Sequence, residues 1–209
     1  MSQVETSSLA SYPFSLTWYG SPVRSRVLGP AALEITAGSK TDVFVNPQGG
    51  ESSLDAQSML NAPRLLARVS GDFQLVSHVA VEFAATFDAG ALLIWVSDDQ
   101  WGKLCFEYSP QGNPMVVSVV SKGVSDDANS FVTPNRDVWL RASRVGGAFA
   151  FHASLDGHRW EFIRHFALDA GETVELGFEA QSPTGNGCTA RFEEIRFSDQ
   201  RLGDLRSGD

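Results

Sequence analysis

The stretch ALLIWVSDDQWGKLCFEY, residues 91–108, decides the fold class of this chain. Two runs rich in aliphatic and aromatic residues, 91–96 and 103–108, flank a polar break, and polar and apolar side chains alternate in the second run. Alternation with a period of two places successive side chains on opposite faces of a strand. The stretch therefore predicts two β-strands.

Strand-like runs of the same kind continue on both sides of this stretch. They cover residues 79–87, 115–120, 138–144, 148–154, 160–166, 174–180 and 190–197. Turn signals recur about every 8 to 12 residues, which is typical of a β-sandwich or barrel. We expect a single all-β domain over residues 1–209, with an ordered core from about 12 to 200, frayed ends, and at most one short helical turn within residues 52–60.

Composition excludes two classes of partner. Asp and Glu total 25 against 16 Lys and Arg, a net charge of −9, and a nucleic-acid surface needs clustered basic residues. The longest apolar run, residues 91–96, is far below the ~18 residues that a membrane span needs. We therefore expect no nucleic-acid and no membrane partner, and the N-terminus has no export signal, which favours a cytoplasmic protein.

The two cysteines, Cys105 and Cys188, lie far apart inside strand-like segments with no CxxC pattern. This spacing favours buried, reduced thiols over a disulfide or a zinc site.

Short motifs are distributed over most of the chain in a characteristic order. They are WYGSP (18–22), KTDVF (40–44), NP (46–47), GDF (71–73), DAGAL (88–92), WGKLCFE (101–107), VSVV (117–120), GVSDDANS (123–130), WLR (139–141), FHASLDGHRW (151–160) and AQSP (180–183). Together they resemble a family of β-sandwich domains of uncharacterised function. That family is grouped with the concanavalin A-like lectins and glucanases and includes a protein named as a regulator of enolase. The resemblance implies a jelly-roll sandwich of two antiparallel sheets, one of them concave.

Four polar side chains are candidates for a common site on that concave sheet. Lys103 and Glu107 share one face of their predicted strand, and Arg141 and His152 lie on the polar faces of two others. If these faces meet, they form a groove for a ligand or an active site. The alternative is a solvated sheet face covered with salt bridges.

A catalytic use of the same groove would need acid and base groups. Glu107 or His152 would transfer protons, and Lys103 or Arg141 would stabilise developing negative charge. Retaining and inverting glycosidases use two carboxylates, which on one strand would stand at alternate positions, and no such run occurs. The turn at Asp156-Gly157 predicts a structural hairpin.

The segment 123–129 concentrates oxygen ligands in a predicted loop, with Asp126 and Asp127 at its centre. Hard cations prefer such ligands, so Ca²⁺ is an alternative to a loop that only bonds its own backbone. Otherwise we expect no cofactor and no metal. The same loop could form the rim of a sugar site, with Trp101 supplying an apolar face.

These observations favour a protein that binds a small polar ligand, preferably a carbohydrate, and that regulates carbohydrate metabolism. The expected ligand-binding residues are Trp101, Lys103, Glu107, Asp126, Asp127, Arg141 and His152. Two alternatives remain: an enzyme of hydrolase, lyase or isomerase type in the same groove, and a module that binds a protein partner.

Overall fold

The structure, a computed structural model, describes residues 6–48 and 58–209 of the chain. These residues form 17 β-strands and no helix, which confirms the all-β prediction. In this part of the chain there is accordingly no helix that could cross a membrane.

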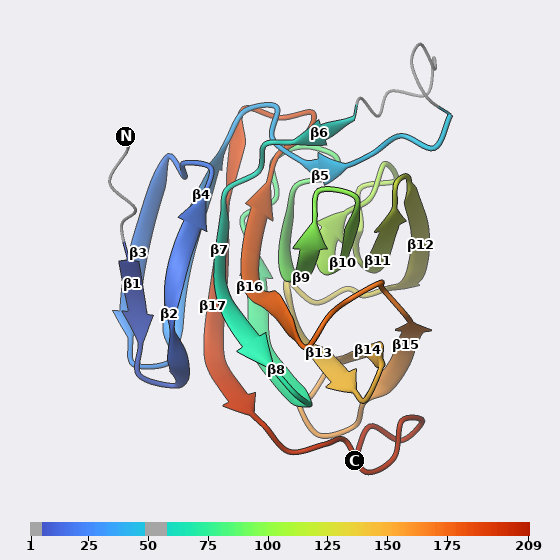
Figure 1. Cartoon of the computed structure of the whole chain (residues 1–209). Helices are drawn as coiled ribbons and strands as arrows, with labels where there is room; N and C mark the ends of the chain where they lie inside the picture. The colour runs from blue at the N-terminus through green and yellow to red at the C-terminus, as the bar shows by residue number, and fades with distance from the viewer. Residues whose placement is uncertain (1–5, 49–57) are drawn as a thin grey trace.

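Sheet A is antiparallel throughout (Figure 1). Across the sheet, its strands are β1 (Thr6–Leu9), β2 (Tyr12–Tyr19), β7 (Arg64–Ser70), β16 (Thr173–Gln181), β9 (Ala89–Ser97), β10 (Gln100–Tyr108), β11 (Pro114–Lys122) and β12 (Ser125–Val132). The predicted runs at 91–96 and 103–108 are β9 and β10, which pair with each other.

Sheet B is also antiparallel. Its strands, again in order, are β15 (Glu161–Phe166), β14 (Ala148–Ser154), β13 (Asp137–Val145), β8 (Phe73–Val81), β17 (Gly187–Ser198), β4 (Ala32–Gly38) and β3 (Arg24–Gly29). The short strands β5 (Val43–Phe44) and β6 (Met59–Leu60) pair with each other. Thus β12 and β15 are edge strands of different sheets.

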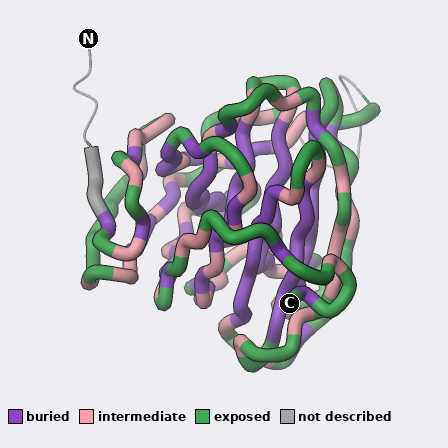
Figure 2. The backbone as a smooth tube through the Cα atoms, turned by 60° about the horizontal axis from the view of Figure 1, so that its bottom comes forward, coloured by how far each residue is buried: buried purple, intermediate pink, exposed green. Residues whose placement is uncertain are grey.

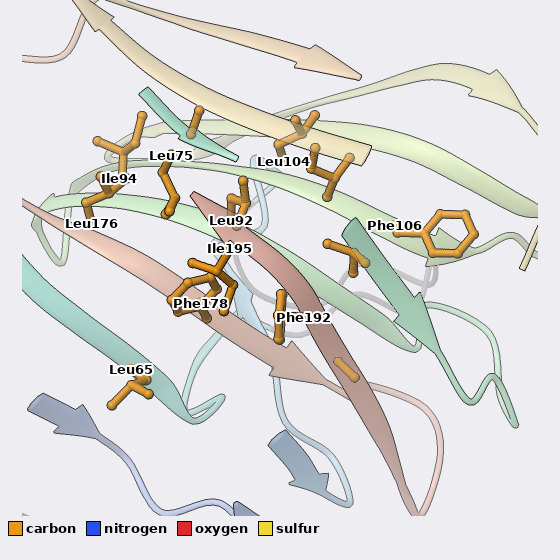
Figure 3. Close-up of a cluster of buried hydrophobic side chains, with 14 of the residues drawn as sticks. Leu65, Leu75, Leu92, Ile94, Leu104, Phe106, Leu176, Phe178, Phe192 and Ile195 are labelled. Atoms are coloured by element: carbon orange, nitrogen blue, oxygen red, sulfur yellow. The ribbon is translucent and has the colours of Figure 1, made fainter. Parts of the chain in front are cut away.

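The main hydrophobic core lies between sheets A and B. Leu104 and Phe106 of β10 point into it, together with Phe192 of β17 from the opposite sheet (Figure 3). At Gly90 of β9, a Cβ atom would lie 2.8 Å from the Cβ of Ala190, so the missing side chain lets the sheets approach closely. Buried positions concentrate on the central strands, whereas the edge strands β3 and β12 and many turns are largely exposed (Figure 2).

Residues 40–46 and 58–62, which we call the strap, cross the outer face of sheet A. At one end Thr41 exchanges backbone hydrogen bonds with Ser182, and at the other Ser125 of β12 donates its N–H to the carbonyl of Val45 at 2.8 Å. A second apolar cluster, which includes Val43, is enclosed between the strap and the sheet. The strap therefore covers part of the outer face of sheet A.

Two expectations about irregular segments need correction. Residues 203–209, which we call the tail, are not frayed: Gly203 and Asp204 donate their N–H groups to the carbonyl of Asp209 at 2.7 and 2.8 Å. The helical turn expected within residues 52–60 falls mostly on residues 52–57, outside the described residues, and Met59–Leu60 form strand β6. Backbone pairing with β5 decides the conformation there.

Candidate functional site

The four polar residues expected in one groove lie on opposite outer faces of the sandwich. Lys103 and Glu107 are on β10 of sheet A, whereas Arg141 is on β13 and His152 on β14 of sheet B. Their apolar neighbours on each strand face the shared core, so period-two alternation directs these polar side chains away from one another. The single-groove expectation is wrong for this reason.

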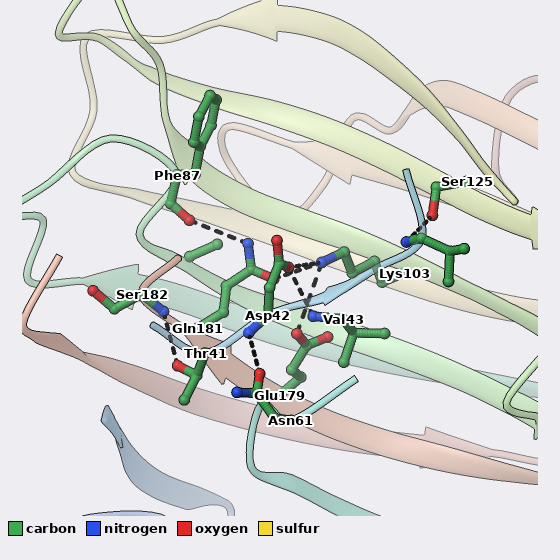
Figure 4. Close-up of polar contacts among 12 residues, drawn as sticks. Thr41, Asp42, Val43, Asn61, Phe87, Lys103, Ser125, Glu179, Gln181 and Ser182 are labelled. Carbon is green, nitrogen blue, oxygen red and sulfur yellow. Dashed lines mark hydrogen bonds and ion pairs between the residues drawn. The ribbon is translucent and has the colours of Figure 1, made fainter. Parts of the chain in front are cut away.

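Lys103 is the centre of a buried charge cluster between sheet A and the strap (Figure 4). Its Nζ donates to Oδ1 of Asp42 at 3.0 Å and to Oε1 of Gln181 at 2.5 Å. It also lies 3.8 Å from Oε1 of Glu179. Asp42 belongs to the strap, and its Oδ1 accepts a further bond from the N–H of Val43 at 2.7 Å. Lys103 therefore fastens the strap to the sheet.

Burial and charge act against each other in this cluster. Burial alone would lower the pKa of Lys103, but Asp42 and Glu179 outweigh it and the pKa is raised. Burial raises the pKa of Glu179 to about 7 against the opposing effect of Lys103, and it raises that of Glu107 well above its ordinary value. The cluster thus holds a charged lysine beside a carboxyl group that titrates near neutral pH.

The cluster is closed to ligands in this structure. Lys103 is 1% exposed and Trp101 is 0% exposed. The indole of Trp101 stacks on Trp95 with ring centroids 6.1 Å apart. Trp101 therefore belongs to a packed layer and presents no open face to a sugar, contrary to expectation.

Arg141 and His152 are covered by the tail on the outer face of sheet B. The guanidinium of Arg141 lies 4.3 Å above the ring of Trp160, and Nε2 of His152 bonds to the carbonyl of Leu205 at 2.9 Å. Burial lowers the pKa of Arg141 to about 10 and that of His152 to about 4. His152 is therefore a neutral imidazole at pH 7 and is not exposed as a general base.

Asp126 and Asp127 lie on a strand and not in a cation-binding loop. Residues 125–132 form β12, where successive side chains point to opposite faces. Asp126 pairs with Arg164 at 2.8 Å, and Asp127 is exposed. Within residues 6–48 and 58–209 no group of three or more His, Cys, Asp or Glu residues is placed to hold a metal ion. Cys105 and Cys188 are buried free thiols, as predicted.

An open groove of about 850 Å³ lies between the edge strands β12 and β15. Its polar lining residues are Ser118, Asn129, Ser130, Asp156, Arg159, Glu161 and Arg164. Its apolar lining includes Phe131, Leu155, Phe162 and Ile163. Sequence reasoning missed this groove because no local pattern indicates that edge strands of two different sheets face each other.

Two arrangements fix the shape of the groove. Arg164 of β15 donates to the carbonyls of Ser118 and Asp126 at 3.3 and 3.2 Å, so it ties the two sheet edges together. Oδ1 of Asp156 accepts the N–H groups of His158 and Arg159 at 2.8 Å each, which forms the predicted hairpin turn. These backbone bonds lower the pKa of Asp156 to about 2.

Comparison with solved structures gives the same fold. A functionally unknown protein from Saccharomyces cerevisiae covers 88% of this chain and 95% of its own, with 22% identity and a TM-score of 0.77. The Bacteroides ovatus xyloglucan PUL GH43B matches 95% of this chain at 14% identity and a TM-score of 0.68. The GH43 protein BlXynB (K247S) from Bacillus licheniformis matches 87% at 13% identity and a TM-score of 0.67.

This chain spans only 40% and 36% of those two GH43 chains, and at these identities the likeness shows a shared fold. A search of curated protein sequences finds no match. The family model described as "Protein of unknown function (DUF1349)" matches residues 18–200. The chain therefore belongs to the DUF1349 family and folds as a β-sandwich.

Proposed function

We propose that this protein binds a short carbohydrate in the groove between β12 and β15. The observation that supports this most directly is the groove itself, because its volume of about 850 Å³ falls in the range of small-ligand sites, roughly 300–1,000 Å³. The closed cluster around Lys103 offers no comparable opening. The occurrence of this fold in chains named as GH43 proteins supports a carbohydrate as the ligand.

The lining residues suit a sugar. Asn129, Arg159 and Glu161 are exposed and supply amide, guanidinium and carboxylate groups for hydroxyl groups. Phe131 and Ile163 supply apolar surface against the C–H groups of a sugar ring. Since Arg164 and Asp156 are already held by hydrogen bonds, the groove loses little conformational freedom when a ligand binds.

The proposal is binding without turnover. Glycoside hydrolysis needs one carboxyl group that stays protonated until it donates its proton. Of the two carboxylates that line the groove, Asp156 has the opposite shift, with its pKa lowered to about 2, and Glu161 is exposed to solvent. Glu107 and His152, the acid and base candidates of the catalytic alternative, are buried and do not line the groove, and the tail covers His152.

We further propose that the protein acts in the cytoplasm, in carbohydrate metabolism. Buried free thiols at Cys105 and Cys188 suit a reducing compartment.

Calorimetric titration with a panel of mono- and oligosaccharides tests the site. For a sugar that binds, Arg159→Ala should weaken the affinity about tenfold, the loss typical of a hydrogen bond to a charged group. Arg26→Ala is the matched control, because Arg26 is exposed on β3 at the far edge of sheet B. Equal affinities for the two variants, or no binding by any sugar, would overturn the proposal.

A further inference from the structure

The tail covers Arg141, Trp160 and His152 on the outer face of sheet B, and we call the place that it fills over them the pocket. Polar atoms of Arg141 and His152 in this place have no hydrogen-bond partner among the described residues. Arg141 is 5% exposed and His152 is 0% exposed, so both are removed from water. Arg141 forms no ion pair with a carboxylate of the described residues. The negative charge of Asp209 in the tail acts on the guanidinium from beyond ion-pair distance. A buried cation whose N–H groups have no hydrogen-bond partner is costly.

The unsatisfied atoms of Arg141 form one edge of its guanidinium. Nη1 has a long contact of 3.4 Å with Oε1 of Gln74, whereas Nε and Nη2 have no hydrogen-bond partner in the part of the chain that is described. Nε and Nη2 lie side by side and point the same way, which is the geometry that binds the two oxygens of a carboxylate or phosphate. The stacking of the guanidinium on Trp160, at 4.3 Å, fixes the direction of this edge.

His152 adds a second unsatisfied atom to the same pocket. Because the carbonyl of Leu205 can only accept, Nε2 of His152 must hold the proton of this bond. Nδ1 is then an acceptor, and no described residue donates to it. Nδ1 can therefore accept a hydrogen bond from a hydroxyl group of a bound molecule.

The tail occupies this pocket with backbone atoms at Gly208. A Cβ atom on Gly208 would lie 2.4 Å from Nη2 of Arg141 and 2.8 Å from Cβ of Trp160, and its φ of +78° also favours glycine. The backbone thus covers the free edge of Arg141 without making a hydrogen bond to it. The segment excludes water from the guanidinium and does not replace the bonds that water would make.

We propose that Arg141, Trp160 and His152 form a binding site for a small oxyanion, a carboxylate or phosphate group, and that the tail competes with this ligand. The site lies on sheet B and is distinct from the groove between β12 and β15. An anionic ligand with an adjacent hydroxyl group would bond to the Arg141 edge through its oxygens and to Nδ1 of His152 through that hydroxyl. Its binding requires residues 203–209 to leave the pocket.

Substitution of Gly208 in the chain of 209 residues tests the competition. Gly208→Ala places a methyl group against Arg141 and Trp160 and should release the tail. If the tail is seated in about nine molecules out of ten, its release should tighten binding about tenfold. The probes are inorganic phosphate, acetate and glucuronate, with glucose as the neutral control. Their relative affinities separate a phosphate site from a carboxylate site, and the NMR signal of the Arg141 Nε–H reports contact directly.

Gly208→Ala combined with Arg141→Lys should lose this binding, because an ammonium group cannot make the paired bonds. Gly208→Ala combined with Arg191→Lys is the matched control, since Arg191 pairs with Glu34 on another part of sheet B. The proposal is overturned if no anion shifts the Arg141 Nε–H signal of Gly208→Ala although hydrogen exchange shows a released tail. It is also overturned if the two double variants bind equally. A tail that stays protected from exchange in Gly208→Ala would also contradict it.

Discussion

Lys103 of sheet A and Asp42 of the strap form a buried ion pair, with Nζ and Oδ1 3.0 Å apart. The two residues are 61 positions apart in the chain, and their side chains are 2% and 11% exposed. The pair joins a strand that lines the main core to the segment that closes the outer face of the same sheet. Its first role is therefore to hold the strap in place.

Replacement of Lys103 tests this role. Lys103→Met leaves the carboxylates of Asp42 and Glu179 without their cation, and the removal of one partner from a buried pair typically costs about 3–5 kcal/mol. The free energy of unfolding, measured with urea, should fall by that amount. Lys122→Met, at an exposed lysine on β11, is the control and should change it by less than about 0.5 kcal/mol. Equal effects of the two substitutions would show that Lys103 does not anchor the strap.

Glu179 should make stability depend on pH. Its pKa is about 7 in the folded protein against an ordinary value of 4.5, so the folded state holds a proton that the unfolded state releases between these values. The contribution of Glu179 to the free energy of unfolding is fully present below pH 4.5 and is lost as the pH rises toward 7. Above pH 7 it no longer changes with pH. Between pH 4.5 and 7, Glu179 should therefore lower the free energy of unfolding by about 3 kcal/mol in total.

Glu179→Gln should remove this part of the pH dependence. Urea unfolding at several pH values should show that the variant gains stability relative to the wild type from pH 4.5 to 7. A stability difference that stays constant over this range would refute the assignment.

His152 should remain neutral in mildly acidic solution. Burial, with Arg141 nearby, lowers its pKa to about 4, despite the bond to the Leu205 carbonyl. The imidazole ¹⁵N shifts should show a neutral ring with the proton on Nε2 at pH 5.5, well below the ordinary pKa of about 6.5. Protonation with a midpoint near 6.5 would mean that the tail does not cover His152 in solution.

Gly177 of β16 should tolerate no side chain. A Cβ atom there would lie 2.1 Å from the carbonyl oxygen of Leu65 on the neighbouring strand β7, and backbone cannot move aside cheaply. Gly177→Ala should cost about 3 kcal/mol, at the upper end of overpacking effects. Gly29→Ala, which meets no atom within 4 Å, is the control in the same thermal or urea measurement. Similar stabilities for both variants would contradict the close approach of β16 and β7.

The local alternation of polar and apolar residues was sufficient to predict the strands and which face of each strand points into the core. Alternation around Leu104 and Phe106 correctly separated the core side of β10 from the side with Lys103 and Glu107. The same rule could not say that β10 and β13 belong to different sheets, because strand order depends on long-range pairing. The loop predicted over residues 123–129 is wrong from Ser125 onward for a related reason. Polar composition predicts a turn, but pairing with β11 makes residues 125–132 an edge strand.

The strap and the groove depend on contacts that sequence does not reveal. Asp42 reaches Lys103 because the strap crosses sheet A, and the KTDVF motif that contains Asp42 does not indicate this contact. Arg164 bonds to β12 because the edge strands β12 and β15 lie side by side. The sequence of β15 shows only the alternation of polar and apolar residues that any strand can have. For these residues the candidate site could be found only from the structure.

The most direct test of the proposed function is to map a bound sugar by NMR. An oligosaccharide that binds in calorimetry should shift the backbone amides of residues 129–131 and 155–164, and leave those of the strap and the tail unchanged. Shifts confined to those two ranges would support a carbohydrate site in the groove between β12 and β15. Shifts centred on the amides around Trp101 and Lys103, with residues 129–131 and 155–164 unaffected, would contradict it.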